Sequence, residues 1–257
     1  MLKIATWNVN SLKARKERFL AFLQRESPDL VCLQELKGVD EIFPRAEIEA
    51  AGYHAQVFGQ KTYNGVAVIS KGPSEIVSKS FEDGVDDPAA RFLCVRTHGI
   101  YVASAYIPNG QAVGSEKYAY KLEWLKRLRR YLDKRFTPKD PLVVAGDFNV
   151  APEDRDVYDP ESWKGQILFS DLEKAALKEV CAFGLQDTFR KFHTEGDLYS
   201  WWDYRMLGFP KNRGLRIDFV LATPPLWEKC TAARIDRDER KGSSPSDHAP
   251  VLAEFTS

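Results

Sequence analysis

Apolar runs and amphipathic segments alternate along most of this chain. Runs such as residues 30–34 and 141–145 are apolar at consecutive positions, which is typical of strands buried on both faces. Residues 13–25 instead place apolar side chains on one helical face and charges elsewhere, which is typical of an amphipathic helix. We expect strands at residues 1–9, 30–34, 53–58, 65–70, 76–80, 92–97, 100–105 and 141–145, and helices at 13–25, 43–51, 116–136 and 171–183.

The order of these elements indicates the fold class. Strands and helices alternate in part, but some strands follow each other directly, as in a hairpin turned by His98-Gly99. This order favours a layered α/β protein with mixed sheets over a doubly wound parallel fold. The 257 residues show no obvious linker and no short repeat, so we expect one domain over residues 1–257.

Polar side chains recur with the apolar runs: at the ends of three of them, in the middle of the run at 215–221, and just before the last run. Buried strands normally avoid such residues unless they meet at a shared site. Each segment alone could be a polar cap or an Asx turn, but five of them indicate chemistry at one sheet edge. The five segments are residues 4–10, with Asn8 and Asn10; 30–35, with Glu35; 142–149, with Asp147 and Asn149; 215–221, with Asp218; and 246–252, with Asp247 and His248.

Composition narrows the classes of function. Lysine plus arginine and aspartate plus glutamate number 37 each, so the formal net charge is +0. Bulk electrostatic wrapping of nucleic acid is therefore disfavoured, although a local basic face fits this balance. The four cysteines have no CxxC spacing and are interpreted as reduced, mostly buried thiols. We see no signal peptide and no apolar run of membrane-spanning length, so we expect a cytoplasmic protein without a membrane partner.

The polar segments, taken in order, resemble the exonuclease-endonuclease-phosphatase family, which includes deoxyribonuclease I. More narrowly, the chain resembles the exonuclease III-like branch of apurinic/apyrimidinic (AP) endonucleases, and the likeness covers nearly all of it. The family fold is a four-layer α/β sandwich, in which two facing mixed sheets are flanked by helices. The matching segments are Thr6-Trp7-Asn8-Val9-Asn10, Leu33-Gln34-Glu35, Tyr106-Ile107-Pro108-Asn109, Gly146-Asp147-Phe148-Asn149, Tyr199-Ser200-Trp201-Trp202-Asp203-Tyr204-Arg205, Arg213-Gly214-Leu215-Arg216-Ile217-Asp218 and Ser246-Asp247-His248-Ala249-Pro250.

The resemblance implies a Mg²⁺ site, with Mn²⁺ as a substitute. A carboxylate at a strand end suits a hard octahedral cation, so we expect Glu35 to bind the metal directly. Asp247 and the amide of Asn10 would complete the site through water, and Asn8 would support the same corner. Some relatives have an acid in place of Asn10, so the amide in this chain removes a charge from the site.

The resemblance also implies the catalytic residues. Asp147 would orient or deprotonate the attacking water, and Asn149 would hold a phosphate oxygen beside it. Asp218 would orient His248 and favour its imidazolium form, which would donate to the phosphate. Without the other segments, His248 would be interpreted as a cap of the last strand.

Tyr106 and Asn109 belong to one loop, and the resemblance places both on the scissile phosphate. The structural alternative is a turn at Pro108 in which Tyr106 only packs. Tyr106, Asp147 and water on the metal all remain candidates for protonating the leaving 3′ oxygen.

Specificity for abasic DNA would come from a small apolar pocket. The resemblance assigns Trp201, Leu215 and Ile217 to its wall, where a flipped deoxyribose without a base would fit and an intact nucleotide would not. Some relatives have Trp in place of Leu215, so the pocket here would be looser. Basic residues around the pocket would contact backbone phosphates, although Arg216 could instead pair with a nearby acid. These basic residues are Arg205, Lys211, Arg213 and Arg216.

Together these features predict a Mg²⁺-dependent DNA-repair nuclease that cuts 5′ to an abasic site, removes blocked 3′ ends and degrades duplex DNA from 3′ termini. We expect a monomer whose partner is double-stranded DNA, especially abasic or 3′-blocked DNA, and which associates with the nucleoid while it acts. The many Lys and Arg residues of the helix at 116–136, including Lys121 and Arg127, are interpreted as an ordinary solvated face.

Two alternatives use the same fold. The first is a phosphatase that acts on inositol phosphates or lipids, and the segment 201–205 disfavours it. The second is a catalytically inactive RNA-binding regulator. Such regulators lose acids at the strand ends, whereas this chain has Glu35, Asp147, Asp218 and Asp247.

Overall fold

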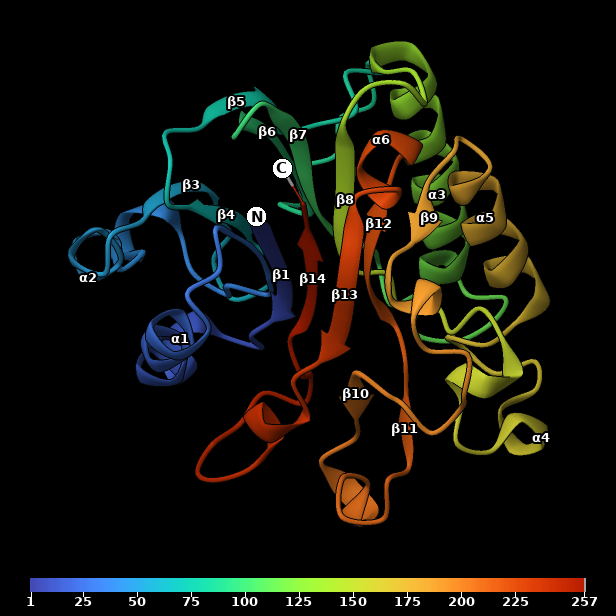
Figure 1. Cartoon of the computed structure of the whole chain (residues 1–257). Helices are drawn as coiled ribbons and strands as arrows, with labels where there is room; N and C mark the ends of the chain where they lie inside the picture. The colour runs from blue at the N-terminus through green and yellow to red at the C-terminus, as the bar shows by residue number, and fades with distance from the viewer. Residues whose placement is uncertain (257) are drawn as a thin grey trace.

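The computed structural model describes residues 1–256, and two β-sheets pack face to face at its centre (Figure 1). Within these residues the first sheet has six strands in the order β13-β14-β1-β2-β4-β3. β1 and β2 run parallel and the other neighbours run antiparallel, so the sheet is mixed. Its strands are β1 (Leu2–Asn8), β2 (Leu30–Gln34), β3 (His54–Phe58), β4 (Val66–Ser70), β13 (Cys230–Ile235) and β14 (Val251–Phe255).

The second sheet is also mixed. In the described residues it has six strands in the order β5-β6-β7-β8-β12-β9, of which β7 and β8 are parallel. Its strands are β5 (Glu75–Ser78), β6 (Phe92–Thr97), β7 (Ile100–Tyr106), β8 (Leu142–Asp147), β9 (Gln186–Asp187) and β12 (Asp218–Ala222). A separate ribbon of β10 (Trp201–Trp202) and β11 (Gly214–Leu215) lies beyond the edge of the sheets (Figure 1).

Helices cover the outer face of each sheet, which completes four layers (Figure 1). On the first sheet lie α1 (Leu12–Glu26) and α2 (Arg45–Ala50), and on the second lie α3 (Glu116–Arg135) and α5 (Asp171–Cys181). Shorter helices are α4 (Pro160–Trp163) and α6 (Pro224–Trp227), and 3-10 turns are η1 (Asp40–Ile42), η2 (Asp154–Asp156), η3 (Phe189–Lys191), η4 (Arg205–Leu207) and η5 (Arg237–Arg240). No helix in residues 1–256 is both long and apolar enough to cross a bilayer.

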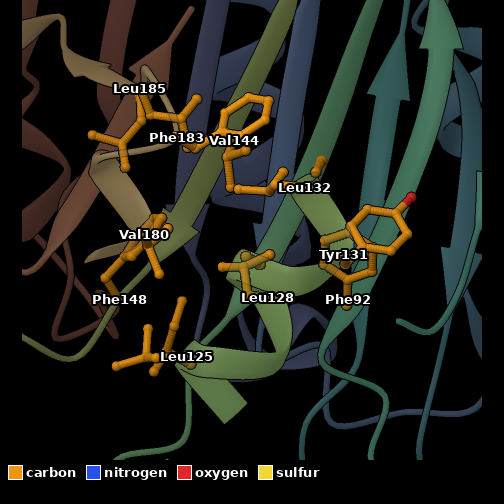
Figure 2. Close-up of a cluster of buried hydrophobic side chains, with 14 of the residues drawn as sticks. Phe92, Leu125, Leu128, Tyr131, Leu132, Val144, Phe148, Val180, Phe183 and Leu185 are labelled. Carbon is orange, nitrogen blue, oxygen red and sulfur yellow. The ribbon is translucent and has the colours of Figure 1, made fainter. Parts of the chain in front are cut away.

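Both faces of the central strands are buried, which explains their continuous apolar runs. Val143 faces the core between the two sheets, whereas its neighbour Val144 faces the core under α3 and α5. Figure 2 shows this second core, where Phe148, Leu128 and Val180 pack together. Fully burying one such side chain contributes about 1.5 to 3 kcal/mol, so these layers hold the two sheets at a fixed spacing.

The strand register brings the polar segments to one edge of the sandwich. Because β1 and β2 are parallel and in register, Asn8 and Glu35 emerge together from the first sheet. In the second sheet, Asp147 lies opposite both Tyr106 of β7 and Asp218 of β12. The packing of the two sheets therefore places polar residues from distant parts of the chain side by side.

The four-layer fold with facing mixed sheets is confirmed, but several element ends and short elements differ from the expectation. The strand expected at 215–221 with Asp218 in its middle is divided between β11 and β12, and Asp218 begins β12. The strand expected at residues 141–145 continues to Asp147, and the helix expected at 171–183 ends at Cys181. The helix expected from residue 43 begins at Arg45, because Phe43 precedes Pro44 and is extended, with ψ 134°. The short elements β9, β10, β11, α4 and α6 were not predicted as separate elements.

The prediction of a solvated basic face on α3 is wrong for two of its residues. Lys121 is 0% exposed and Arg127 is 5% exposed. Arg127 pairs with Asp83 at 2.7 Å and with Asp87 at 2.9 Å. Lys121 pairs with Glu173, so each cation is buried beside acids from a distant segment of the chain. The helical periodicity of α3 gives no information about these partners, which is why the burial was not predicted.

Candidate active site

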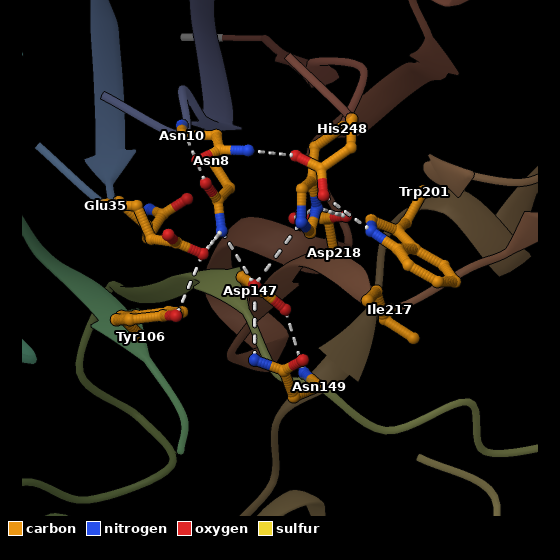
Figure 3. Close-up of polar contacts among 12 residues, drawn as sticks. Asn8, Asn10, Glu35, Tyr106, Asp147, Asn149, Trp201, Ile217, Asp218 and His248 are labelled. Carbon is orange, nitrogen blue, oxygen red and sulfur yellow. Dashed lines mark hydrogen bonds and ion pairs between the residues drawn. The ribbon is translucent and has the colours of Figure 1, made fainter. Parts of the chain in front are cut away.

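Asp147 lies at the centre of the polar edge and is 1% exposed (Figure 3). It ends β8 directly after Gly146, where an added Cβ would lie 1.8 Å from the carbonyl oxygen of Ala105. A glycine is therefore required at this position for β7 to approach β8 closely. The narrow spacing holds the Asp147 carboxylate where the strands β7, β8 and β12 meet.

Amide groups and a histidine surround the Asp147 carboxylate (Figure 3). Its oxygens accept hydrogen bonds from Asn8 Nδ2 at 2.9 Å and from the Asn149 backbone N–H at 2.9 Å. His248 Nε2 lies 3.7 Å from Oδ2. Burial raises the pKa of Asp147 to about 7, because it outweighs the opposing effect of the His248 charge. The carboxylate can therefore gain and lose a proton near neutral pH.

His248 is held by Asp218, as the resemblance implied. The ring Nδ1 lies 2.9 Å from Asp218 Oδ2, and the side chain is almost fully buried. Burial disfavours the imidazolium, but Asp218 and Asp147 outweigh that effect and raise the pKa of His248 to about 10. His248 is thus a cation at neutral pH, with Nε2 free of Asp218 and directed toward Asp147 (Figure 3).

Ser200 holds Asp218 in place and was not assigned a role from the sequence. Its Oγ donates to Asp218 Oδ2 at 2.6 Å and accepts from the backbone N–H groups of Ile217 and Asp218, both at 3.1 Å. Ser200 is 0% exposed. Its hydroxyl therefore fixes the carboxylate that orients the histidine, but a serine in a polar loop segment gives no sequence signal for this role.

Glu35 lies at the other end of the site, directly after β2. Its Oε1 accepts from Asn8 Nδ2 at 2.9 Å and from the Tyr106 hydroxyl at 2.9 Å. Its Oε2 lies 2.9 Å from Lys37 Nζ. Burial favours the protonated form, but Asn8 and Lys37 outweigh it, so the pKa of Glu35 is lowered. Glu35 is therefore an anion at neutral pH.

The donor set around Glu35 suits a hard cation. Lys37 Nζ contacts both Glu35 Oε2 and Asn10 Oδ1, the latter at 2.5 Å, so these two oxygens converge on one positive charge. One potential ligand atom each from Glu35, Asp147 and His248 lies within 4.8 Å of the other two. As an imidazolium, His248 carries an N–H on both ring nitrogens and offers no lone pair, so oxygen atoms are the available ligands.

Asp247 supports this corner through its neighbours. Its Oδ1 accepts from Asn10 Nδ2 at 2.9 Å, and its Oδ2 accepts from Trp201 Nε1 at 3.0 Å. Burial opposes ionisation of Asp247, but the His248 charge and these two donors outweigh it and lower its pKa. Asp247 therefore connects Asn10 to the indole of Trp201 (Figure 3).

The ends of β7 and β8 and the loops after them bring three more polar side chains to Asp147, namely Tyr106, Asn109 and Asn149. Asn109 Nδ2 donates to Asn149 Oδ1 at 3.3 Å, and Asn149 Nδ2 donates to the carbonyl of Ile107 at 3.0 Å. Burial and the charge of Glu35 raise the pKa of Tyr106 well above its usual value, so its hydroxyl keeps its proton. Asn109 is exposed, whereas Asn149 is buried and its Nδ2 also donates to Asp147 Oδ2 at 3.3 Å.

The expected apolar pocket residues come together beside His248. Trp201 pairs with Leu215 across the β10–β11 ribbon, and both pack in one cluster with Ile217. Trp201 also forms a β-bridge with His248, so the cluster directly adjoins the polar edge that holds Asp147. Leu168 and Phe169, which the sequence did not suggest, also belong to this cluster.

The basic residues divide into two groups. Arg205 is exposed and pairs with Asp203, and Arg213 is also exposed. Arg216 is only 1% exposed and pairs with Asp156 at 2.6 Å and Asp187 at 2.7 Å. Arg216 is therefore the structural partner of buried acids, which is the alternative that the sequence left open. Because its guanidinium is buried, Arg216 is not available to contact a DNA phosphate.

Sequence comparison agrees with this geometry. The pattern that describes the "Endonuclease/Exonuclease/phosphatase family" matches residues 5–248. This chain belongs to that family. It is 35% identical to exodeoxyribonuclease III of Haemophilus influenzae, in an alignment that covers 99% of this chain and 100% of the relative. The family assignment thus rests on nearly the whole chain.

Solved structures of the family have the same fold. A 3′ phosphatase from Neisseria, NExo, bound to a product DNA hairpin, superposes with a TM-score of 0.96 at 39% identity, and each chain is covered completely. An AP endonuclease from Archaeoglobus fulgidus has the same TM-score, identity and coverage. The relatives therefore include proteins named for each of the three activities that the sequence predicted together: exonuclease, 3′ phosphatase and AP endonuclease.

Proposed function

We propose that this family member is a DNA-repair nuclease that hydrolyses the phosphodiester 5′ to an abasic site and also removes nucleotides or blocking groups from 3′ ends. The observation that carries the proposal is the position of the apolar cluster. Trp201 is partly exposed, whereas Leu215 and Ile217 of the same cluster are buried. Trp201 contacts the polar edge through His248 and Asp247, so a sugar packed against Trp201 would hold its 5′ phosphate near Asp147. The relatives named as a 3′ phosphatase and as an AP endonuclease support both activities.

The reaction begins at Asp147 in this proposal. With a pKa of about 7, its carboxylate accepts a proton from the water molecule that lies between Asp147 and the scissile phosphate and attacks the phosphorus atom. Asn149 fixes the carboxylate through its backbone N–H and offers its side chain to a phosphate oxygen. The proton and the nucleophile are thus controlled by one short segment at the end of β8.

Negative charge that develops on the phosphate meets the imidazolium of His248. Asp218 holds Nδ1, which leaves Nε2 to donate toward a phosphate oxygen. Glu35 and Asn10 would hold Mg²⁺, or Mn²⁺ in its place, and Asp247 and Asn8 would support them. When bound, the metal supplies Lewis-acid neutralisation of phosphoryl charge.

The proposal is tested with an end-labelled duplex that contains one tetrahydrofuran abasic analogue, with Mg²⁺ or with EDTA. We expect a single metal-dependent cut 5′ to the analogue. Asp147→Ala should lower the rate by about 10²- to 10⁴-fold, because the proton acceptor is lost. Digestion from 3′ ends without the internal cut would refute abasic specificity. Binding of RNA without cleavage, or hydrolysis of inositol phosphates alone, would refute the nuclease proposal.

A further inference from the structure

Lys121 is buried beside the backbones of Asn109 and Asn149, and the proposed reaction assigns it no role. Lys121 of α3 is 0% exposed, and its ammonium forms an ion pair with Glu173 of α5, which is also 0% exposed. Figure 1 shows α3 and α5 side by side on the outer face of the second sheet. Burying two charges carries a large desolvation cost, which the contacts of the two side chains must offset. We therefore consider what each contact holds in place.

The three N–H groups of the Lys121 ammonium all have acceptors. One contacts Glu173, one donates to the backbone carbonyl of Asn149 at 2.6 Å, and one donates to the backbone carbonyl of Asn109 at 3.1 Å. Asn109 and Asn149 carry the side-chain amides on the phosphate side of Asp147. Lys121 therefore joins the backbones of the two loops that present these amides.

The carboxylate of Glu173 is equally occupied, and its contacts lead to the apolar pocket. Oε1 accepts from the Leu168 N–H at 3.1 Å, and Oε2 accepts from the Ser170 N–H at 3.1 Å and from the Ser170 hydroxyl. Leu168 is buried in the pocket cluster with a φ of 73°, which is strained for leucine. Its carbonyl accepts from the Ala151 N–H at 2.8 Å, two residues beyond Asn149.

We propose that Lys121 and Glu173 are a positioning pair for the cleavage reaction, which fixes both the phosphate-side amides and the pocket wall. This inference rests on the proposed function, because it concerns the same site. A fully satisfied buried network is rigid, and it has one geometry. The pair thus sets the distance between the pocket that receives the sugar and the amides that receive its phosphate.

The double variant Lys121→Met/Glu173→Met separates positioning from stability. Apolar residues of similar volume often replace a buried ion pair with little loss of stability. We therefore expect Lys121→Met alone to lower both the unfolding midpoint and kcat, whereas the double variant regains the midpoint but not kcat. The expected loss of kcat in both is about a hundredfold with KM little changed, as for a misplaced reacting group.

Arg127→Met is the matched control, because Arg127 is a buried cation on the same helix with its own acids, Asp83 and Asp87. It should lower the unfolding midpoint and leave kcat at the wild-type value. The positioning role is overturned if the double variant regains wild-type kcat together with its stability. It is also overturned if Arg127→Met loses kcat as strongly as Lys121→Met does.

Glu173→Gln decides the matter if the Lys121 variants do not fold, because it keeps the shape of the side chain. A lower kcat with KM little changed, measured well below the unfolding midpoint of the variant, supports the proposal, and a wild-type kcat overturns it. All variants are measured on the abasic analogue and on a recessed 3′ end. A wild type that cuts only the 3′ end refutes abasic specificity alone, and the variants are then compared on that substrate.

Discussion

At the scale of single residues, opposite charges in one buried site set the proton chemistry. Burial raises the pKa of Asp147 to about 7, while the His248 charge acts in the opposite direction. The pKa of His248 is raised to about 10 by Asp218 and Asp147 against the effect of burial. Between these two values Asp147 is ionised and His248 is charged, which is the combination that the proposed reaction needs.

We expect kcat/KM to rise with pH through about 7, because the ionised form of Asp147 accepts the proton. A second, alkaline limb near pH 10 would reflect the loss of the His248 charge. In His248→Gln the favourable charge beside Asp147 is absent, so the acid limb should move to higher pH. The measurement is kcat/KM against pH at saturating Mg²⁺. An acid limb at the same pH in both proteins would contradict the role of Asp147.

Ser200→Ala should lower both stability and activity. The change leaves two backbone N–H groups without their acceptor and frees the Asp218 carboxylate, so we expect a loss of about 1 to 3 kcal/mol in unfolding free energy. The rate should fall because His248 loses its fixed partner. Thr188→Val is the control, since the Thr188 hydroxyl contacts only the Val220 carbonyl, away from the site. Chemical denaturation and single-turnover cleavage measure the two effects, and unchanged cleavage in Ser200→Ala would contradict the proposed link.

The sequence predicted the acids and amides at strand ends, because such residues are out of place in apolar strands. Ser200 and Lys37 were missed because serine and lysine are ordinary in polar loops. The burial of Lys121 and Arg216 could not be predicted, because their acidic partners are far away in the sequence. The partner of Lys121, for example, is Glu173, on another helix.

At the scale of elements, the end of β8 determines the shape of the site. The sequence predicted this strand over residues 141–145, and the structure extends it by two residues to Asp147. They continue the sheet because Gly146 permits close contact with β7 and Asp147 pairs in register with Asp218. Short elements such as β10 and β11, with two residues each, have too few positions to show periodicity.

Gly146→Ala should destabilise the protein, because the new Cβ would lie 1.8 Å from the carbonyl oxygen of Ala105. Overpacking typically costs about 1 to 3 kcal/mol, and a backbone clash between two central strands should lie at the upper end. Gly196→Ala is the control, since its nearest neighbour would lie at 3.6 Å, an ordinary contact. Urea unfolding of both variants measures the difference. Equal stability would show that β7 and β8 can separate without cost.

At the scale of the whole molecule, the site exists only where the two sheets meet. The first sheet and its flanking loops supply Asn8, Glu35 and His248, and the second supplies Asp147 and Asp218. Neither the register within each sheet nor the docking of one sheet on the other was predicted from sequence patterns, because both depend on contacts between residues that are far apart in the chain. The five polar segments predicted that these residues would meet at one sheet edge, and the family resemblance predicted the role of each.

Metal binding should stabilise the folded molecule as a whole. Mg²⁺ at a hundred times its Kd would add about 2.7 kcal/mol to the unfolding free energy if it binds the folded state alone. We expect Mg²⁺ to raise the unfolding midpoint of the wild type, and EDTA to reverse the effect. In Glu35→Gln the rise should be lost, because the charged ligand is replaced by a neutral amide. An equal rise in both proteins would place the metal elsewhere.

The side-chain amide of Asn8 donates at once to Glu35, in its own sheet, and to Asp147, in the other. Both hydrogen bonds form together only when the two sheets are packed face to face. A partly unfolded molecule, with its layers apart, therefore has no assembled site, whatever secondary structure it keeps. Such a dependence acts as a safeguard, because a misfolded or half-folded copy of an enzyme that cuts DNA would be unable to damage the genome.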